Sequence, residues 1–445
     1  MKKVLVVVGG DAAGMSAASK AKRVNPDLDV IVFEMGEYIS YSQCSLPYYI
    51  SGVTPSKEKL ISRTTEDFAK RDISVYLNHE VVEVDVKEKT VEVMNHENGE
   101  KFIRPYDYLM YATGANSQVP PIPGSDLENV MSLKTIPTAD AIKEVAHRDE
   151  IQEVAIVGGG YIGLEMVETM VHLNKKVRII QRSDQLMNVM DDEFGEIIRA
   201  ELEKHGVSVH TGESLTELTG NGKVTGLKTD KGTYNADLVI LALGVKPATE
   251  LLKDSGAEFL RNGALVVDGF SRTTIPDVYA GGDCASIYHK IKKENVYLPL
   301  GTNANKQGRI AGGHIAGENQ ELKGVIGTSV LKVMDLSVGL TGLTEREAKE
   351  MNLNYDTVVV KSANHAGSYP GRKRITIKLV YEKESMVILG AQMLGEDGVA
   401  KRLDVFAVAI DQGMTTEELG FADLCYAPPF ATVWDAVQVA ANAAK

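Results

Sequence analysis

Short apolar runs alternate with helix-like segments in the first part of the chain. Residues 4–8 form a β-branched run, residues 12–23 carry apolar positions at helical spacing, and residues 29–33 form a second apolar run. Short continuous apolar runs are typical of strands that are buried on both faces of a parallel sheet. The pattern predicts a strand–helix–strand unit at the N-terminus.

The same pattern recurs in the middle of the chain. Residues 154–157 and 176–180 predict two strands that flank a helix, and the helix follows a run of glycines. The other segments of this part are a hairpin-like alternation at 81–93, apolar strands at 106–113, 237–243 and 278–283, and a linker at Pro120–Gly124. Two such units predict an α/β fold with two Rossmann-like nucleotide-binding domains.

The pattern changes after about residue 325. Predicted strands now lie at 330–334, 357–360, 375–380 and 387–389, and predicted helices lie near 345–352 and 399–412. Strands and helices in this mixture predict a third, α+β domain.

Composition narrows the possible partners and compartments. At 445 residues the chain is long enough for two to four domains. Its 48 Lys+Arg against 61 Asp+Glu leave a net charge of −13, which argues against nucleic acids and anionic membranes as partners. No apolar run approaches the roughly 18 residues of a membrane span. Three cysteines make no disulfide framework, so we expect a cytoplasmic protein.

Two glycine motifs predict cofactor sites. Gly158-Gly159-Gly160-Tyr161-Ile162-Gly163 follows a predicted strand and opens a helix, the context in which glycines let the backbone approach a pyrophosphate; the alternative is a merely tight turn. The first motif holds Gly9, Gly10 and Gly14 but has Asp11 in the middle, a carboxylate that fits only if it turns away to cap the helix. Glu34, twenty residues past Gly14, stands where a ribose-binding acid belongs.

The second unit lacks such an acid. Its second strand ends in Gln181-Arg182, and a neutral glutamine does not repel a 2′-phosphate, with which Arg182 or Arg178 could pair. Alternatively, Arg182 is a solvated surface residue. We therefore expect NADPH, NADH or both as the reductant.

Cys44 is the main candidate for redox chemistry. It directly follows the predicted cofactor strand, and Pro47 suits the first turn of a helix that begins at about the cysteine. A thiol at a helix N-terminus has a lowered pKa. The alternative is a small buried hydrophobic residue, the interpretation we give to Cys284 and Cys425.

Several motifs together resemble the pyridine nucleotide–disulfide oxidoreductases over the whole chain. They are Ala112-Thr113-Gly114, Gly281-Gly282-Asp283, Asn305-Lys306-Gln307-Gly308-Arg309 and Ser40-Tyr41-x-x-Cys44-x-Leu46-Pro47-Tyr48. The last is similar to the pattern of coenzyme A-disulfide reductases in the single-cysteine branch. The resemblance implies tightly bound FAD, a homodimer and three domains: an FAD domain (1–115 and 245–325), an NAD(P)H domain (116–244) and a C-terminal dimerisation domain (326–445).

The resemblance also implies roles for individual residues. Tyr161 is expected to lie over the flavin until nicotinamide displaces it, and Tyr426 to reach the partner subunit's active site, with Tyr369 or Ser368 in the place of a second tyrosine. Lys20, Arg23, Ser40 and Gln43 are expected to contact coenzyme A. The expected cofactor contacts are Gly9, Gly10, Ala13, Gly14, Glu34, Thr113, Gly114, Gly158, Gly160, Tyr161, Ile162, Gly163, Gln181, Arg182, Gly244, Gly282, Asp283 and Ala304. No metal is expected.

These features favour NAD(P)H-dependent reduction of coenzyme A disulfide through a mixed disulfide on Cys44. The first alternative is an NAD(P)H oxidase or peroxidase that works through a Cys44 sulfenate. Oxidases and peroxidases of this type carry a histidine in the first glycine loop, where this chain has Ala12, which argues against this alternative. A persulfide or polysulfide reductase remains an alternative, although no rhodanese-like extension follows Lys445. The non-enzymatic alternative is a flavin-bound redox sensor.

Overall fold

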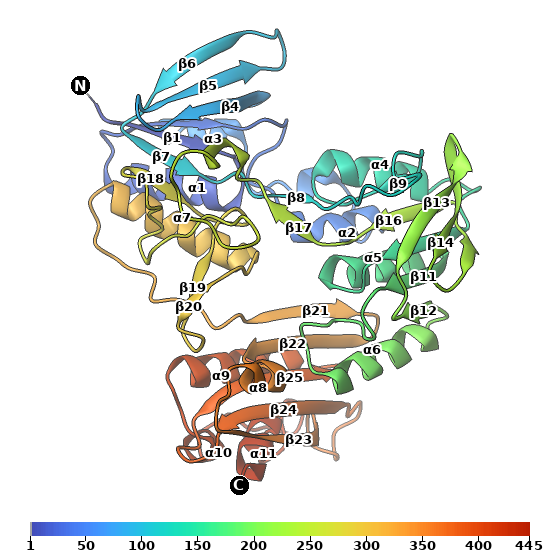
Figure 1. The fold of residues 1–445 in the computed structure, drawn as a ribbon. Coiled ribbons are helices and arrows are strands. Elements are labelled where there is room, and N and C mark those ends of the chain that lie inside the picture. The colour runs from blue at the N-terminus through green and yellow to red at the C-terminus, as the bar shows by residue number, and fades with distance from the viewer. Residues whose placement is uncertain (1) are drawn as a thin grey trace. The chain divides into compact units, whose positions relative to one another are not determined.

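The chain divides into two compact units in the computed structural model, which describes residues 2–445 (Figure 1). The first unit holds the residues up to 118 together with 134–139 and 245–325. The second holds 119–133, 140–244 and 326–445. The finer division into three domains remains a prediction. In residues 2–445 no helix has both the length and the apolar character that a membrane crossing requires.

A five-stranded sheet forms the centre of the first unit. Its strand order is β18-β7-β1-β2-β3, and all four pairings are parallel. The bounds are Val4–Val8 for β1, Asp29–Phe33 for β2, Ile73–Tyr76 for β3, Tyr108–Tyr111 for β7 and Val278–Ala280 for β18. The N-terminal strand–helix–strand prediction is confirmed, since helix α1 (Ala12–Val24) joins β1 to β2.

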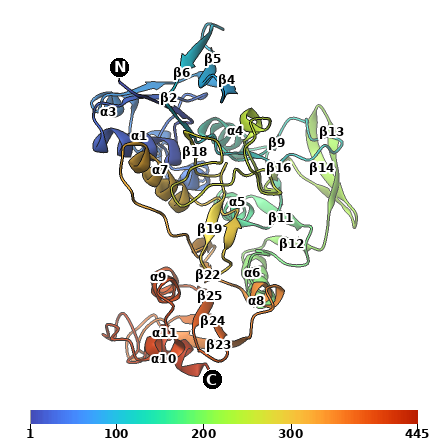
Figure 2. The same ribbon diagram turned by 60° about the vertical axis from the view of Figure 1, so that its left-hand side comes forward.

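Helix α7 (Gly301–Ile315) lies along α1 in both views (Figures 1 and 2). Glycines make this close approach possible. A Cβ on Gly308 would lie 2.1 Å from the carbonyl oxygen of Ala13, and one on Gly312 would lie 2.2 Å from that of Ala17. The glycine of the Asn305–Arg309 motif is therefore explained by helix–helix packing.

The other face of this sheet packs against a second apolar cluster, to which an antiparallel sheet contributes Val81, Val91 and Val93. That sheet comprises β4 (His79–Asp85), β5 (Thr90–Asn95) and β6 (Lys101–Pro105), which confirms the hairpin predicted at 81–93. The smaller elements of this unit are η1 (Gln43–Ser45), α2 (Leu46–Ile50), η2 (Lys57–Lys59), α3 (Thr65–Ala69), β8 (Ala115–Ser117), β17 (Val245–Pro247), η3 (Glu250–Leu252), β19 (Ile287–His289) and β20 (Glu294–Val296).

The second unit repeats this plan. Its parallel sheet has the order β12-β11-β10-β16-β9. A three-stranded antiparallel sheet, β13-β14-β15, comes before β16, which pairs with β10, just as β4-β5-β6 comes before β7, which pairs with β1. The bounds are β9 (Val130–Met131), β10 (Glu153–Val157), α5 (Tyr161–His172), β11 (Lys176–Gln181), α6 (Asp192–Lys204), β12 (Ser208–Thr211), β13 (Leu215–Asn221), β14 (Lys223–Thr229), β15 (Thr233–Asn235) and β16 (Leu238–Leu241). Helix α4 spans Ile136–Ala146.

The C-terminal part of the second unit is an antiparallel sheet with helices. The strand order is β21-β22-β25-β24-β23; α9 packs on β22 and β25, and α11 packs on β23 and β24. The bounds are β21 (Ser329–Val333), β22 (Leu336–Gly342), α8 (Glu345–Glu350), β23 (Tyr355–Ala363), β24 (Arg374–Glu382), β25 (Ile388–Gly395), α9 (Val399–Asp411), α10 (Thr416–Gly420) and α11 (Ala436–Ala443). The predicted α+β character is confirmed.

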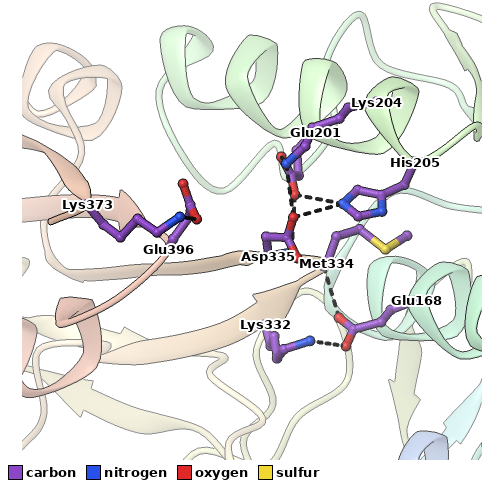
Figure 3. A network of polar contacts seen from close by, with 9 residues as sticks. All are labelled: Glu168, Glu201, Lys204, His205, Lys332, Met334, Asp335, Lys373 and Glu396. Carbon is purple, nitrogen blue, oxygen red and sulfur yellow. Dashed lines mark hydrogen bonds and ion pairs between the residues drawn. The ribbon is translucent and has the colours of Figure 1, made fainter. Parts of the chain in front are cut away.

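Polar contacts hold the turn between β21 and β22 against α5 and α6 (Figure 3). The Met334 amide donates to Glu168 Oε2 at 3.0 Å, and the Asp335 amide donates to Glu201 Oε1 at 3.1 Å. Glu201, His205 and Asp335 bring their potential metal-ligand atoms within 4.8 Å of one another. The Lys204 ammonium, however, lies 3.2 Å from Glu201 and 2.9 Å from Asp335, so a cation already balances the two carboxylates. We interpret this group as an ion-pair network.

Candidate active site

The first glycine loop is closed by hydrogen bonds to Glu34. The Gly10 amide donates to Glu34 Oε2 at 2.7 Å, and the Gly36 amide donates to Oε1 at 2.8 Å. A Cβ on Gly14 would lie only 1.9 Å from the carbonyl oxygen of Gly9. The loop therefore needs glycine at 14 and holds a carboxylate at the end of β2, an arrangement that fits the ribose and pyrophosphate of a dinucleotide.

Asp11 does not cap α1, contrary to the sequence interpretation. Although it occupies the N-cap position, its side chain makes no capping hydrogen bond; instead its Oδ1 accepts the amide of Tyr41 at 3.2 Å. Burial raises the Asp11 pKa to about 7, with the amide of Tyr41 and the charge of Lys134 opposing the shift. The Asp11 carboxylate binds the Tyr41 amide instead of the amides of its own helix. A titratable carboxyl therefore lies beside the first glycine loop.

The Gly281-Gly282-Asp283 turn is positioned by the Asn305–Arg309 motif. Buried Gln307 accepts the Gly282 amide at 3.0 Å through Oε1 and donates to the Ser286 carbonyl at 2.7 Å through Nε2. A Cβ on Gly282 would lie 3.2 Å from Ala13 Cβ and 3.5 Å from Ala304 Cβ. The structure thus brings together Ala13, Gly282 and Ala304, three of the expected FAD contacts.

Lys134 links this turn to Gln43, the residue before the candidate redox cysteine. Its Nζ lies 3.1 Å from Asp283 Oδ2 and donates to Gln43 Oε1 at 3.4 Å. Sequence patterns gave no indication of this lysine, because Gln43, Lys134 and Asp283 come from three distant segments. Its side-chain nitrogen therefore lies between a carboxylate and a carboxamide at the expected flavin site.

Cys44 is exposed and lies in the 3₁₀ turn η1, immediately before α2. Backbone bonds fix this segment: the Ser40 amide donates to the Gly10 carbonyl at 2.9 Å, and the Ser42 amide donates to the Leu60 carbonyl at 2.9 Å. Pro47 lies in the first turn of α2, as predicted. Helix α2 has only five residues, so few aligned peptide dipoles support the expected effect on the thiol.

The second glycine loop has the same backbone contacts with a neutral partner. The Gly159 amide donates to Gln181 Oε1 at 2.8 Å, and a Cβ on Gly163 would lie 1.8 Å from the Gly158 carbonyl oxygen. A Cβ added to Gly160 or Gly244 would meet no atom within 4 Å, so both glycines face open space where a cofactor could approach. Arg182 is exposed, as either of its two interpretations allows.

Arg178, the other candidate for a 2′-phosphate, is engaged elsewhere. Its guanidinium carbon lies 4.5 Å from the centre of the Tyr234 ring, and its Nη1 donates to the Asn235 carbonyl at 3.3 Å. These contacts leave Arg182 as the better candidate of the two.

Two titratable side chains, Tyr161 and Glu165, lie at the start of α5, directly after the second glycine loop. The hydroxyl of Tyr161 lies 2.6 Å from Ser329 Oγ, and burial raises its pKa. Ile162 follows it in the first turn of the helix. Burial, reinforced by the charge of Glu168, raises the pKa of Glu165 to about 7. The sequence motifs did not point to Glu165, because it lies in the helix after the last glycine and belongs to none of the cofactor motifs.

The expected substrate contacts differ in their availability. Lys20 is only 12% exposed and pairs with Glu318 at 2.6 Å, so its charge is compensated inside the unit. Arg23 is exposed in the last turn of α1. Ser40 adopts a left-handed conformation with φ of 48°. Thr113, an expected cofactor contact between β7 and β8, donates through Oγ1 to the Ala248 carbonyl at 2.6 Å.

The remaining cysteines and the two tyrosines are placed as follows. Cys284 is buried as predicted, and burial raises the pKa of its thiol to about 11. Cys425 is exposed, so the prediction of a buried residue is wrong: it lies in a surface coil that lacks regular structure. Its neighbour Tyr426 is 49% exposed, and Tyr369 is 46% exposed.

Comparison with known proteins decides the family. The model for pyridine nucleotide-disulphide oxidoreductases matches residues 3–308, and that for the dimerisation domain of the same proteins matches residues 328–437. This chain belongs to the pyridine nucleotide-disulphide oxidoreductases. It is therefore a flavoprotein oxidoreductase of the NAD(P)H-dependent type, with the dimerisation domain of its family.

Relatives within this family carry several activities in their names. The chain is 41% identical to the CoA-dependent NAD(P)H sulfur oxidoreductase of Pyrococcus abyssi, over 100% of this chain and 99% of the relative. It is 35% identical to an NADH oxidase of Methanocaldococcus jannaschii, over 98% and 97% of the two chains. It is 29% identical to a coenzyme A disulfide reductase of Staphylococcus aureus, over 99% of each.

Among solved structures, the NAD-dependent persulfide reductase of A. fulgidus superposes with a TM-score of 0.96. The two sequences are 36% identical, and the match covers 99% of this chain and 83% of that one. The likeness confirms the fold and leaves the acceptor of the electrons to be argued from the site.

Proposed function

We propose that this oxidoreductase uses NAD(P)H to reduce the disulfide of coenzyme A, with Cys44 as the only redox-active thiol of the subunit. The supporting observation is an exposed cysteine beside the expected flavin site without a second usable thiol in the same unit. Cys284, the other cysteine there, is fully buried with a raised pKa, and Cys425 belongs to the second unit. A lone thiol must take its second sulfur from the substrate.

The proposed reaction has two sulfur-exchange stages. In the first, the Cys44 thiolate attacks one sulfur of the substrate, a Cys44–coenzyme A disulfide forms, and one coenzyme A thiolate leaves. In the second, that mixed disulfide takes up two electrons, which returns Cys44 to the thiolate and releases the second coenzyme A. FAD, which the first glycine loop with Glu34 and the Gly281–Asp283 turn would hold, would provide the electron-transfer chemistry that links NAD(P)H to this disulfide.

The departing thiolates need a proton source. We assign this role to Tyr426 of the partner subunit, whose hydroxyl would protonate the thiolate and regain a proton from water. The exposure of Tyr426 on the C-terminal part of the chain supports this assignment, because only an exposed side chain can reach another subunit. Gln43, adjacent to Cys44 and bound by Lys134, would orient the substrate next to the thiol.

Cys44→Ser provides the direct test. We expect the variant to bind FAD and to be reduced by NAD(P)H, yet to lose at least about a thousandfold in coenzyme A disulfide turnover, because the nucleophile is gone. Cys425→Ser removes the other exposed thiol and should leave turnover unchanged. Intact-mass measurement of the oxidised wild type should find coenzyme A on Cys44. Wild-type turnover in Cys44→Ser would overturn the proposal.

Reduction of sulfur or persulfide is the second candidate, favoured by the 41% identity to a CoA-dependent sulfur oxidoreductase. The same Cys44 would then attack a polysulfide sulfur. An anaerobic comparison of coenzyme A disulfide and polysulfide, with oxygen as a third acceptor in a separate run, ranks the candidates by kcat/KM. The acceptor with the highest kcat/KM identifies the reaction, and fast turnover with oxygen alone would support an oxidase.

A further inference from the structure

One arginine joins the two loops that carry Tyr369 and Tyr426. Arg402 lies in the first turn of α9, and its side chain is only 12% exposed. Its Nη2 donates to the carbonyl of Asn364 at 2.7 Å and to the carbonyl of Phe430 at 3.0 Å. Asn364 begins the loop between β23 and β24 that contains Tyr369, and Phe430 follows Tyr426 by four residues. A single guanidinium thus holds the backbone of both loops.

The other nitrogens of Arg402 are engaged as well. Nε donates to the two carboxylate oxygens of Asp435 at 3.0 and 2.9 Å, and Nη1 donates to the Gly398 carbonyl at 3.0 Å. Asp435 is itself 10% exposed and caps α11 by accepting the Val437 amide at 3.0 Å. With each nitrogen bonded inside the protein, Arg402 is committed to the scaffold rather than to a phosphate of the substrate.

The two loops also contact each other directly. The Ala366 amide donates to the Pro428 carbonyl at 3.2 Å, and the Tyr369 amide donates to the Ala366 carbonyl at 3.1 Å. The ring of Tyr369 stands edge-on to buried His365, with 5.5 Å between the ring centres. Asn364 closes the base of its loop, because its Oδ1 accepts the Lys373 amide at 2.7 Å. The two loops that carry the exposed tyrosines are therefore joined twice, by the Arg402 guanidinium and by the Ala366–Pro428 hydrogen bond.

We infer that Arg402 is a positioning residue for Tyr426, which it holds in place together with the Tyr369 loop for proton delivery to the departing thiolate. This inference rests on the proposed function. A general acid must stay within hydrogen-bond reach of the atom it protonates, and a displacement of about 1 Å can cost on the order of a hundredfold in rate. The coil that carries Tyr426 has no regular structure of its own, so its precision must come from these bonds.

Arg402→Lys tests this role with two kinds of disulfide. Lysine keeps the charge opposite Asp435 but cannot reproduce the planar fork that reaches both loops. We expect a ten- to hundredfold loss of kcat with coenzyme A disulfide and less than a threefold loss with dithiobis(nitrobenzoic acid), whose thiolate leaves without a proton. Lys401→Met, on the same helix and 92% exposed, is the matched control and should behave as wild type. Equal losses with both disulfides would overturn the inference.

A double variant separates positioning from general damage. If Arg402 acts through Tyr426, then Arg402→Lys adds almost nothing to the loss already caused by Tyr426→Phe. Multiplied losses would show that Arg402 acts by another route and would overturn the inference. Sedimentation of each variant should show the oligomeric state of the wild type.

Amide hydrogen exchange gives a test that needs no substrate. In FAD-loaded Arg402→Lys, exchange should accelerate at 364–371 and 426–431 together, and stay unchanged in the glycine loops. Acceleration in one loop only, or in neither, overturns the inference. If the wild type fails to reduce coenzyme A disulfide, the proposed function is wrong, and the exchange measurement alone decides whether Arg402 couples the two loops.

Discussion

In the first glycine loop the amide of Gly10 donates to a carboxylate, Glu34, whereas in the second the amide of Gly159 donates to a carboxamide, Gln181. The two distances, 2.7 and 2.8 Å, are nearly the same. The close approach inside each loop is also shared, since a Cβ would lie 1.9 Å from a carbonyl oxygen at Gly14 and 1.8 Å at Gly163. The two loops therefore share their backbone geometry but differ in the charge of the side chain that accepts the second glycine's amide.

This difference separates what the loop needs in order to fold from what selects its ligand. Both loops require an acceptor for the second glycine's amide, and either a carboxylate or a carboxamide oxygen serves. The first unit adds a second partly buried carboxyl at Asp11, where the second unit has Gly160. An acidic loop suits neutral ribose hydroxyls, while the uncharged loop also accepts a 2′-phosphate, which Arg182 can approach.

The largest expected effect comes from a methyl group at the close contact. Gly163→Ala should raise the KM for NAD(P)H by about a hundredfold or more, because its Cβ would force the Gly158 carbonyl to move. Gly160→Ala is the matched variant, since its Cβ meets no atom within 4 Å. We expect it to keep the wild-type Tm, so any rise in KM reports cofactor in that space. Steady-state kinetics and calorimetry measure both, and a normal KM in Gly163→Ala would refute the shared-loop argument.

The second prediction exchanges the two acceptors. In Glu34→Gln the amide nitrogen must face the N–H of either Gly10 or Gly36, which leaves a part-buried donor unsatisfied and costs about 1–3 kcal/mol. We therefore expect FAD to bind about tenfold more weakly or worse, as measured by its release on dilution. Gln181→Glu keeps the acceptor for Gly159, so the fold should persist.

In Gln181→Glu the added charge should lower the NADPH/NADH ratio of kcat/KM by about tenfold, equivalent to about 1.4 kcal/mol. Arg182→Gln provides a comparison, because it removes the cation without adding an anion. An unchanged ratio in both variants would show that these side chains do not select the cofactor.

Local patterns predicted most of the scaffold but few of the contacts between distant segments. The βαβ units, the glycine loops and the exposed Cys44 follow from apolar periodicity and from motifs within about thirty residues. Lys134 escaped notice because only the fold brings it to Gln43 and Asp283. Asp11 was misinterpreted for the same reason, since its partner is the amide of Tyr41. The prediction that Cys425 is buried was wrong because free cysteines are usually buried, whereas its position in a surface coil depends on how the whole chain folds.

The smallest effect concerns titration near the second loop, where Glu165 has a pKa of about 7 because of burial and Glu168. A carboxyl whose folded pKa is raised keeps its proton between about pH 4.5 and 7 while the unfolded chain has lost it, so stability falls as pH rises through this window. Glu165→Gln removes that dependence.

We therefore expect the Tm of FAD-loaded Glu165→Gln to exceed that of wild type by a margin that grows up to about pH 7 and then levels off. The NAD(P)H dissociation constant of wild type should rise a few-fold above pH 7, because an ionised Glu165 repels the anionic cofactor, and should stay flat in the variant. Calorimetry and fluorescence titration over pH 5–9 check both. Glu196→Gln, an exposed carboxylate on α6, serves as the control. A Tm margin that does not change with pH would contradict a raised pKa of Glu165. The second loop would then have no titrating carboxyl beside it, in contrast to Asp11 at the first loop.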